Sequence, residues 1–290
     1  MTYLSDITTV TVNYNSRAVI EGALRPFVGT HEMLIVDNAS TDDSVSYIQA
    51  AFPAARIIRN RQNLGFGAGI NAALPYVATP YLLLTTPDVL VDADGLRRLH
   101  DQLIRYDDAA FVAPALRVPR GRIETWVMGP NEVQQRNAGL QADGPFCTWF
   151  ASVALCLWRT DALRALGGFD ANIFLYEEDL ELCLRTRQAG YSIIIIPDVV
   201  VDHVSSGSAP RSRRLHWRKD WNFAWSRLYV IGKHVGMKES RRAAWRMIAS
   251  RAPRALLYGL TIDIKRFIRD FAALHGAICY LLGRVPSRPQ

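Results

Sequence analysis

Polar side chains close three apolar, strand-like runs near the start of this sequence. Asn13, Tyr14 and Asn15 end the first run, Asp37 ends the second, and Asp88 follows the third. Aspartate at such a place often caps the following turn. In an open α/β sheet, however, the carboxyl ends of the strands are also where ligands bind. We therefore expect a nucleotide to lie across these ends, with Asp37 accepting a hydrogen bond from a base N–H or a ribose hydroxyl.

Three adjacent carboxylates form a second candidate site. Glu177, Glu178 and Asp179 begin the predicted helix 177–189 within 174-FLYEEDLELCLRTRQAGY-191. One acid there is explained by the helix macrodipole, which favours negative charge at the N-terminus by about 0.3–1 kcal/mol. Three of them repel one another, which is costly unless a cation or a general base makes use of them. A base that removes a proton from a sugar hydroxyl would suit this position.

His203 lies after a predicted strand in 199-VVVDHVSSGS-208. A lone histidine is usually structural. Together with Asp88, however, it would form an Asp/His site for a divalent cation, Mg²⁺ or Mn²⁺. Such hard cations prefer oxygen ligands, so diphosphate and water would supply the rest of the shell.

The stretch 65-GFGAGI-70 follows a strand and opens a helix, as a dinucleotide fingerprint does. That fingerprint needs glycine where Ile70 stands, and the first strand–helix turn, 13–17, contains no glycine. An NAD(P)-dependent enzyme is therefore disfavoured.

Alternating elements must position these groups. The β-branched and apolar runs predict strands at 7–14, 31–38, 55–60 and 81–86, and helices at 16–28, 43–52, 66–77 and 94–105. Such alternation predicts an α/β fold with a mostly parallel sheet and helices on both faces. Further along, we expect a strand at 151–158, a helix at 160–168 and a strand at 191–197. From about residue 212 the pattern is helical, basic and aromatic.

The charge is distributed unevenly. The 290 residues carry a formal charge of +7, but residues 205–290 contain 18 Lys/Arg against 4 Asp/Glu. An acidic body with a basic appendage indicates an anionic partner. The four cysteines show no CxxC spacing, so neither a zinc site nor a disulfide framework is expected. The N-terminus shows no signal-peptide pattern, which indicates a reducing, cytoplasmic location.

An apolar stripe runs along the appendage. Its residues are Leu257, Leu260, Ile264, Phe267, Phe271, Leu274, Ile278 and Leu281. Charged residues interrupt it too often for a transmembrane helix. Three interpretations remain: the stripe packs on the body, pairs with a second protomer, or lies in a membrane interface with arginines at headgroup level.

Seven ordered motifs carry a family resemblance. VNYNS, IVDNAST, NLGFGAGINAAL, TPDV, GGFD, YEEDLELCLRTRQAGY and VDHVSSGS occur in this order over about residues 7–210. Together they resemble glycosyltransferase family 2, in particular its bacterial rhamnosyltransferase-like branch. The resemblance implies a GT-A (Rossmann-like) domain at 1–210, followed by a basic helical appendage at 211–290.

The resemblance also implies roles for particular residues. Asp37 would contact the base, Asp88 would be the surviving carboxylate of a DxD-type metal motif, and Asp179 would be the catalytic base, with Glu178 beside it. The expected donor-binding residues are Asn13, Tyr14, Asn15, Asp37, Asn63, Gly65, Phe66, Gly67, Thr86 and Asp88. The acceptor would contact Trp149 and Glu178, and the metal would be held by Asp88 and His203.

Two departures accompany the resemblance. Thr86 replaces the family's usual asparagine in Asn-Pro-Asp, and 149-WFASVA-154 lacks a glycine that relatives commonly have. The first bears on the metal site and the second on the acceptor pocket.

The expected function is that of an inverting, metal-dependent glycosyltransferase of cell-surface polysaccharide synthesis, peripheral at the inner face of the plasma membrane. Its donor would be a nucleoside-diphosphate sugar, with dTDP-rhamnose favoured, and its acceptor a saccharide or a polyprenyl-linked saccharide. One rival is an inactive sugar-nucleotide-binding homologue. Another is a nucleic-acid-binding protein that uses the basic, Trp-rich segment 211–225, which the acidic body disfavours.

Overall fold

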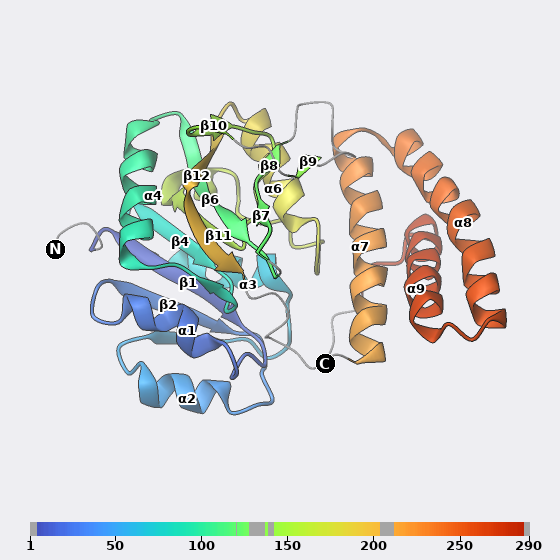
Figure 1. Cartoon of the computed structure of the whole chain (residues 1–290), viewed down its shortest axis with the longest axis horizontal. Coiled ribbons are helices and arrows are strands. Elements are labelled where there is room, and N and C mark those ends of the chain that lie inside the picture. The colour runs from blue at the N-terminus through green and yellow to red at the C-terminus, as the bar shows by residue number, and fades with distance from the viewer. Residues whose placement is uncertain (1–4, 120, 128–136, 139–141, 204–211, 287–290) are drawn as a thin grey trace.

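The computed structural model describes residues 5–119, 121–127, 137–138, 142–203 and 212–286. Figure 1 shows a body built around a twisted sheet, with a group of three long helices at one side of it.

The first half of the sheet is parallel, as the alternation predicts. Its strands are β1 (Ile7–Asn13), β2 (Glu32–Asp37), β3 (Arg56–Arg59) and β4 (Tyr81–Thr85), in the order β3-β2-β1-β4. The helices between them are α1 (Ile20–Leu24), α2 (Ser44–Ala51) and α3 (Phe66–Ala73), and α4 (Ala93–Arg105) follows β4. The predicted strands and helices of this half are confirmed, with ends that differ from the predicted ones by at most four residues.

The second half makes the sheet mixed. β11 (Leu155–Arg159) lies antiparallel between β4 and β6 (Ala109–Arg117), and β12 (Ser192–His203) runs parallel to β6 on its other side. Short strands complete the sheets: β5 (Val89–Leu90), β7 (Ile123–Glu124), β10 (Phe146–Cys147), and the separate pair β8 (Trp126–Val127) and β9 (Asn137–Ala138). The parallel arrangement therefore holds for the first four strands and not for the whole sheet.

Two strand predictions need correction. β6 was not predicted, because Pro114 interrupts its apolar run and proline is normally excluded from a central strand. The structure accommodates it at a bulge: the register of β12 against β6 shifts between Ile196 and Val200, beside Pro114. The predicted strand 151–158 begins only at Leu155, and the loop before it returns the chain to the end of β4.

Helices cover both faces of the sheet. α3, α5 (Thr160–Ala165) and α6 (Glu178–Gln188) lie over one core, which includes Ile70 and Leu180. α1, α2 and α4 lie over the other, which includes Ile48 and Leu96. Both cores are buried and close-packed, which fixes the strand ends that carry the polar side chains.

The appendage is a unit of three helices, α7 (Arg213–His234), α8 (Met237–Leu260) and α9 (Ile264–Leu281). α9 packs its small residues on α7: a Cβ at Gly276 would lie 2.7 Å from the Trp221 carbonyl oxygen. Buried Asp270 of α9 pairs with Arg251 of α8 and with Arg269. None of the helices in the described part of the chain has the length and apolarity that a membrane crossing needs.

The predicted continuous stripe is wrong. Thr261–Asp263 separate α8 from α9, and Ile262 adopts a left-handed φ of 57°. Leu257 and Leu260 therefore belong to one helix and the remaining residues to the next. Leu257 and Leu260 are 54% and 76% exposed, so this end of the stripe does not pack on the body.

The helical unit is anchored to α6 through charged groups. Glu181 of α6 is fully buried and pairs with Arg185 at 2.7 Å, with Lys233 of α7 at 2.7 Å and with His234 at 3.4 Å. Lys233 also contacts Asp170 at 2.6 Å. Burial opposes the charge of Glu181, but these cations outweigh it and lower its pKa to about 2.

The lowered pKa of Glu181 makes the stability of the protein depend on pH. The pKa of Glu181 in the folded protein lies below the ordinary value of 4.5. The carboxylate therefore makes its full contribution to the free energy of unfolding above about pH 4.5, and this contribution is lost as the pH falls towards 2. Glu181→Gln should lower the free energy of unfolding at pH 7 by roughly 3 kcal/mol, since it leaves buried cations without their partner. The difference in the free energy of unfolding between Glu181→Gln and wild type should become smaller as the pH falls from 4.5 to 3.

Urea unfolding at pH 7, 4.5 and 3 measures this effect. Glu21→Gln is the control, because Glu21 pairs with Arg25 on the surface. An equal deficit for Glu181→Gln at all three pH values would contradict the anchoring role of the charge.

Candidate functional site

Asp37 is held in place by Asn13 at the ends of β2 and β1. The two residues are register partners, and Asn13 Nδ2 donates to Asp37 Oδ1 at 2.9 Å. It also donates to the hydroxyls of Ser40 and Ser44, at 3.0 and 2.9 Å. Since the Asn13 side chain is fully buried, it orients Asp37 from behind, while Asp37 itself is 5% exposed.

The loops after β1 and β2 are tied together by Asn15. It adopts a φ of 52°, and its Oδ1 accepts from the backbone N–H groups of Thr41 at 2.7 Å and Asp42 at 3.2 Å. Tyr14 is half-buried between Asn13 and Asn15. The first two strand ends thus form one rigid ledge.

A second network, which sequence reasoning missed, joins this ledge to the glycine-rich turn. Asn38 Nδ2 donates to the Gly65 carbonyl at 2.9 Å, and Asn60 Nδ2 donates to Asn38 Oδ1 at 2.8 Å. Asn63 Oδ1 in turn accepts from the Gly65 N–H at 2.9 Å. The run of asparagines at 38, 60 and 63 was the available signal.

The glycine-rich turn allows a close approach of another segment. Gly65 has a φ of 86°, and a Cβ there would lie 1.9 Å from the Phe174 carbonyl oxygen. A Cβ at Gly67 would lie 2.7 Å from Phe169, whose ring meets Phe66 edge-on at 5.8 Å. The turn therefore seats the segment 169–174, which leads directly into the three acids.

Two consecutive left-handed residues precede α6. Tyr176 and Glu177 have φ values of 63° and 67°, a conformation that costs about 1–2 kcal/mol per residue. The buried Glu177 carboxylate pairs with Arg227 of α7 at 2.9 Å, and Ser226 donates to the Leu175 carbonyl at 3.1 Å. α7 thus holds this strained turn, and the crowding of three acids is relieved because one of them is neutralised.

Asp179 lies in the first turn of α6, half-buried, with Oδ1 accepting from the Leu180 N–H at 2.8 Å. Leu180, the next residue, packs in the core that contains Cys156 and Leu84, and burial together with the charge of Asp179 raises the pKa of the Cys156 thiol. Cys156 is the register partner of Leu84, one residue before β4 ends. The start of α6 therefore packs on the face of the sheet that carries Leu84 and Cys156.

Asp88 and His203 are brought together by strand pairing. Val89, which follows Asp88, pairs with His203 at the end of β12. His203 Nε2 lies 3.5 Å from Asp88 Oδ2. Thr86 anchors the turn by donating from its N–H to the Ala154 carbonyl at 2.9 Å.

The Asp88 carboxylate is kept charged. Burial raises its pKa, but the hydrogen bond and charge of His203 and the hydrogen bond of Thr86 outweigh burial and lower it. Within the described residues no group of three or more His, Cys, Asp or Glu side chains is placed to hold a metal. The pair fits a divalent cation as two ligands, with phosphate oxygens and water completing the shell.

Trp149 contacts α6, and it packs partly buried against the core to which Leu180 and Leu184 belong. Arg187 lies over the Trp149 ring at 5.2 Å. Arg187 comes eight residues after Asp179 in the chain, which along a helix is roughly 12 Å. Glu178, by contrast, is half-buried directly beside Asp179.

Comparisons with known proteins identify a matching family and several relatives. The model of the family described as glycosyl transferase family 2 matches residues 8–156. The N-acetylglucosaminyl-diphospho-decaprenol L-rhamnosyltransferase of Mycobacterium tuberculosis is 24% identical over 216 residues, covering 63% of this chain and 70% of that protein. The rhamnosyltransferase WbbL of Escherichia coli is 26% identical over 155 residues, covering 46% and 58%.

A solved structure supports the fold. The mannosyltransferase PcManGT from Pyrobaculum calidifontis, in complex with GDP-Man and Mn²⁺, is 17% identical with a TM-score of 0.59. The match covers 97% of this chain and 88% of that one.

Proposed function

The chain belongs to glycosyltransferase family 2, with a GT-A fold, and we propose that it is an inverting transferase that moves rhamnose from a nucleoside diphosphate to a lipid-linked saccharide. The observation that supports this is that Asp37 and the Asp88–His203 pair lie where parallel strands end, while Asp179 begins α6, whose Leu180 packs in the same core as Leu84 of β4. Rhamnose is favoured because two relatives are rhamnosyltransferases.

Asp179 is the proposed general base. Its carboxylate accepts the proton of the acceptor hydroxyl while that oxygen attacks the anomeric carbon in line, and the bond from that carbon to the nucleoside diphosphate breaks. A position in the first turn of α6 and the hydrogen bond from the Leu180 N–H both favour the carboxylate form, which is the form that can accept a proton. Glu178 beside it orients the acceptor.

The donor is proposed to lie along the ledge of strand ends. Asp37 accepts a hydrogen bond from the base or ribose, with Asn13 fixing the direction of its carboxylate. Asp88 and His203 would hold a divalent cation, Mg²⁺ or Mn²⁺. When bound, the cation supplies the positive charge that stabilises the departing diphosphate. Thr86 keeps the Asp88 turn in place through Ala154.

A thermal-shift series tests the donor site. At a hundred times its dissociation constant, a donor adds about 2.7 kcal/mol of stability. A panel of nucleotide sugars with Mg²⁺, with Mn²⁺ and with EDTA should show the largest shift for dTDP-rhamnose with metal. If no nucleotide sugar shifts the melt under any of these conditions, the proposed function is wrong.

The acceptor implies contact with a membrane, and we propose that the α8–α9 turn makes it at the inner face of the plasma membrane. Leu257, Leu260 and Ile262 are 54%, 76% and 78% exposed there, and Lys265 and Arg266 follow at the start of α9. Apolar side chains beside cations are the arrangement of an interfacial helix on anionic lipid. We call these three apolar residues the α8–α9 tip.

Replacing all three tip residues with serine should weaken binding to anionic vesicles by at least about 100-fold, since each apolar side chain contributes roughly 1.5 kcal/mol on burial. The residual vesicle binding of this triple variant should be lost at high salt, whereas the vesicle binding of wild type should weaken only partly. Sedimentation with vesicles measures this. The control is Ile104→Ser with Ile123→Ser, both exposed on the body. Equal loss in control and tip variants would refute the assignment.

A further inference from the structure

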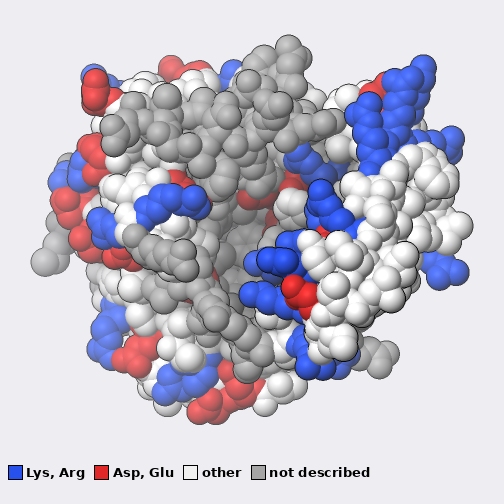
Figure 2. Space-filling view, turned by 45° about the vertical axis from the view of Figure 1, so that its right-hand side comes forward, with Lys and Arg blue, Asp and Glu red and all other residues white. Residues whose placement is uncertain are grey.

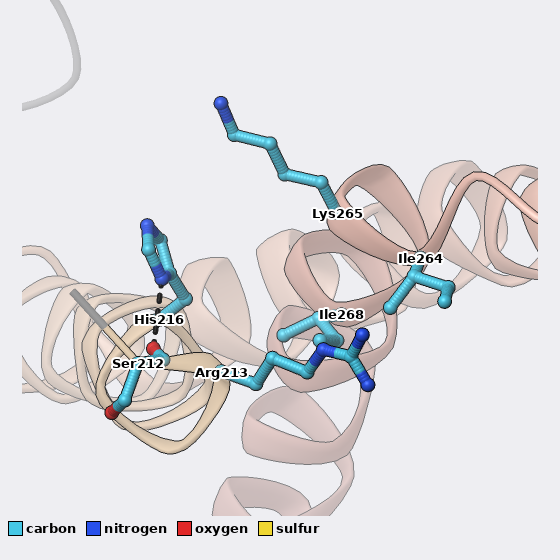
Figure 3. Close-up of a pocket in the computed structure, with 6 residues that line it drawn as sticks. All are labelled: Ser212, Arg213, His216, Ile264, Lys265 and Ile268. Carbon is cyan, nitrogen blue, oxygen red and sulfur yellow. Dashed lines mark hydrogen bonds between the residues drawn. The ribbon is translucent and has the colours of Figure 1, made fainter.

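A basic cavity lies between the first half of α7 and the start of α9. It has a volume of about 570 Å³ and is lined by His216, Lys219, Asp220, Asp263, Lys265, Arg266 and Arg269. A second cavity of about 300 Å³ shares His216 and Lys265 with it and adds Ser212, Arg213, Ile264 and Ile268. Figure 3 shows this second cavity, with Arg213 on α7 reaching towards the two isoleucines on α9. Together they have the size of a small-ligand site.

We propose that this basic cavity binds the diphosphate of a lipid-linked acceptor. The inference rests on the proposed function and deepens it, since it assigns a second, separate anion site on the helical unit.

The cavity carries more cationic than anionic groups. Four Lys/Arg side chains and His216 line the larger part against two carboxylates. Arg266 is partly neutralised by Asp263 at 3.5 Å, and Arg269 by Asp270 at 2.8 Å. Within the described residues, neither Lys219 nor Lys265 has an ion-pair partner. Both ammonium groups therefore remain available to an anion with several oxygens, which is the chemistry of a phosphate or diphosphate.

Apolar side chains adjoin the cations. Ile264 and Ile268 line the smaller cavity, and the strongly exposed Ile262 and Leu260 of the α8–α9 tip precede Ile264 along the chain. A free nucleotide has no hydrocarbon chain that could cover these apolar side chains. A lipid diphosphate matches both parts of the surface, because its charged group contacts the cations and its hydrocarbon chain contacts the apolar side chains.

The cavity also faces the catalytic side of the body. The Lys219 ammonium lies over the Tyr176 ring at 5.6 Å, and Tyr176 is three residues before Asp179. Figure 2 shows a hollow between the body and the helical unit, with Lys and Arg side chains along the helical side. A diphosphate held by Lys219 and Lys265 would leave its saccharide to extend towards Asp179.

Direct binding of a soluble probe tests the site without a membrane. Wild type should bind geranyl diphosphate by calorimetry, and should bind geraniol and inorganic diphosphate more weakly. Lys219→Glu and Lys265→Glu should each weaken geranyl diphosphate binding by at least about tenfold, the loss expected for one charge-assisted contact. Lys238→Glu, the same charge change at the exposed start of α8, should leave it unchanged.

Two results with geranyl diphosphate would overturn the proposal, and a third would come from vesicles. One is that geranyl diphosphate does not bind, or that its binding survives both cavity variants. The other is that Asp88→Ala abolishes the binding, because the probe would then occupy the donor site. The third result is that binding of the protein to anionic phospholipid vesicles depends on Lys219 and Lys265 while geranyl diphosphate does not bind. The cavity would then be a headgroup site, and the acceptor assignment would be wrong.

Kinetics supply the second readout. With a diphosphate-linked acceptor, the cavity variants should raise the acceptor KM about tenfold or more and leave the donor KM unchanged. The same saccharide on a neutral alkyl chain should show no difference between variants and wild type. If wild type transfers no sugar but still binds the probe, the proposed function fails and the cavity stands. If transfer occurs with equal KM values in all variants, the cavity fails and the function stands.

Discussion

Asp179→Asn is expected to lower turnover by about 10²–10⁴-fold while donor binding and melting temperature stay at wild-type values. The amide is nearly isosteric and its oxygen can still accept from the Leu180 N–H, as the carboxylate does at 2.8 Å. It cannot take up the acceptor's proton. Single-turnover rates with saturating donor and acceptor measure the effect.

The two neighbouring acids provide the controls. Glu178→Gln should reduce turnover less, because Glu178 only orients the acceptor in this mechanism. Glu177→Gln should lower stability instead, because Arg227 loses its partner at 2.9 Å. An Asp179→Asn enzyme that retains more than about a third of the wild-type rate would remove Asp179 from the role of base.

Asp88→Ala is expected to abolish the dependence of donor binding on divalent cations and to lower transfer by at least about 100-fold. Losing an outer-shell partner of a metal site costs about 10–100-fold, so losing a ligand should cost no less. His203→Ala should have a smaller effect of the same kind, since its imidazole lies 3.5 Å from the carboxylate. Calorimetric titration of the donor with Mg²⁺, with Mn²⁺ and with EDTA separates binding from catalysis.

Asp202→Asn is the matched control. Asp202 adjoins His203 in β12 but pairs with Arg117 on the surface, so its loss should leave metal dependence intact. Wild-type activity that is unchanged by EDTA would refute the metal assignment whatever the variants do.

The first half of the fold was readable because its signals are local. β-branched runs, caps and turns from Ile7 to Arg105 each agree with one element, so local preference and tertiary structure coincide. For β6 the local signal and the tertiary structure disagree, because Pro114 argues against a central strand. The irregular register of β12 between Ile196 and Val200, far along the chain, is what accommodates this proline. No local pattern reports such a long-range accommodation.

The site residues show the same division. Asp88 and His203 stand more than a hundred positions apart, and only the pairing of Val89 with His203 makes them neighbours. Asn13 has the expected position but acts on Asp37 rather than facing outwards. Gly65 and Gly67 are expected donor-binding residues, and the structure adds that the close approach they allow is to Phe174 and Phe169.

The appendage shows where periodicity misleads. The three–four spacing from Leu257 to Leu281 continues through a break at Ile262, because two helices joined by a short turn can preserve it by coincidence. The small residues of α9 gave the better signal, since Gly276 and Ala277 are what allow close packing on α7.

The anomeric configuration of the product tests the central claim most directly. The enzyme should be incubated with dTDP-rhamnose, Mg²⁺ and N-acetylglucosamine carried on a short polyprenyl diphosphate, and the product examined by NMR spectroscopy. In-line displacement with Asp179 as base predicts one new glycosidic bond whose configuration is opposite to that of the donor. A product that retains the donor's configuration, or no transfer from any nucleotide sugar by a folded enzyme, would contradict it.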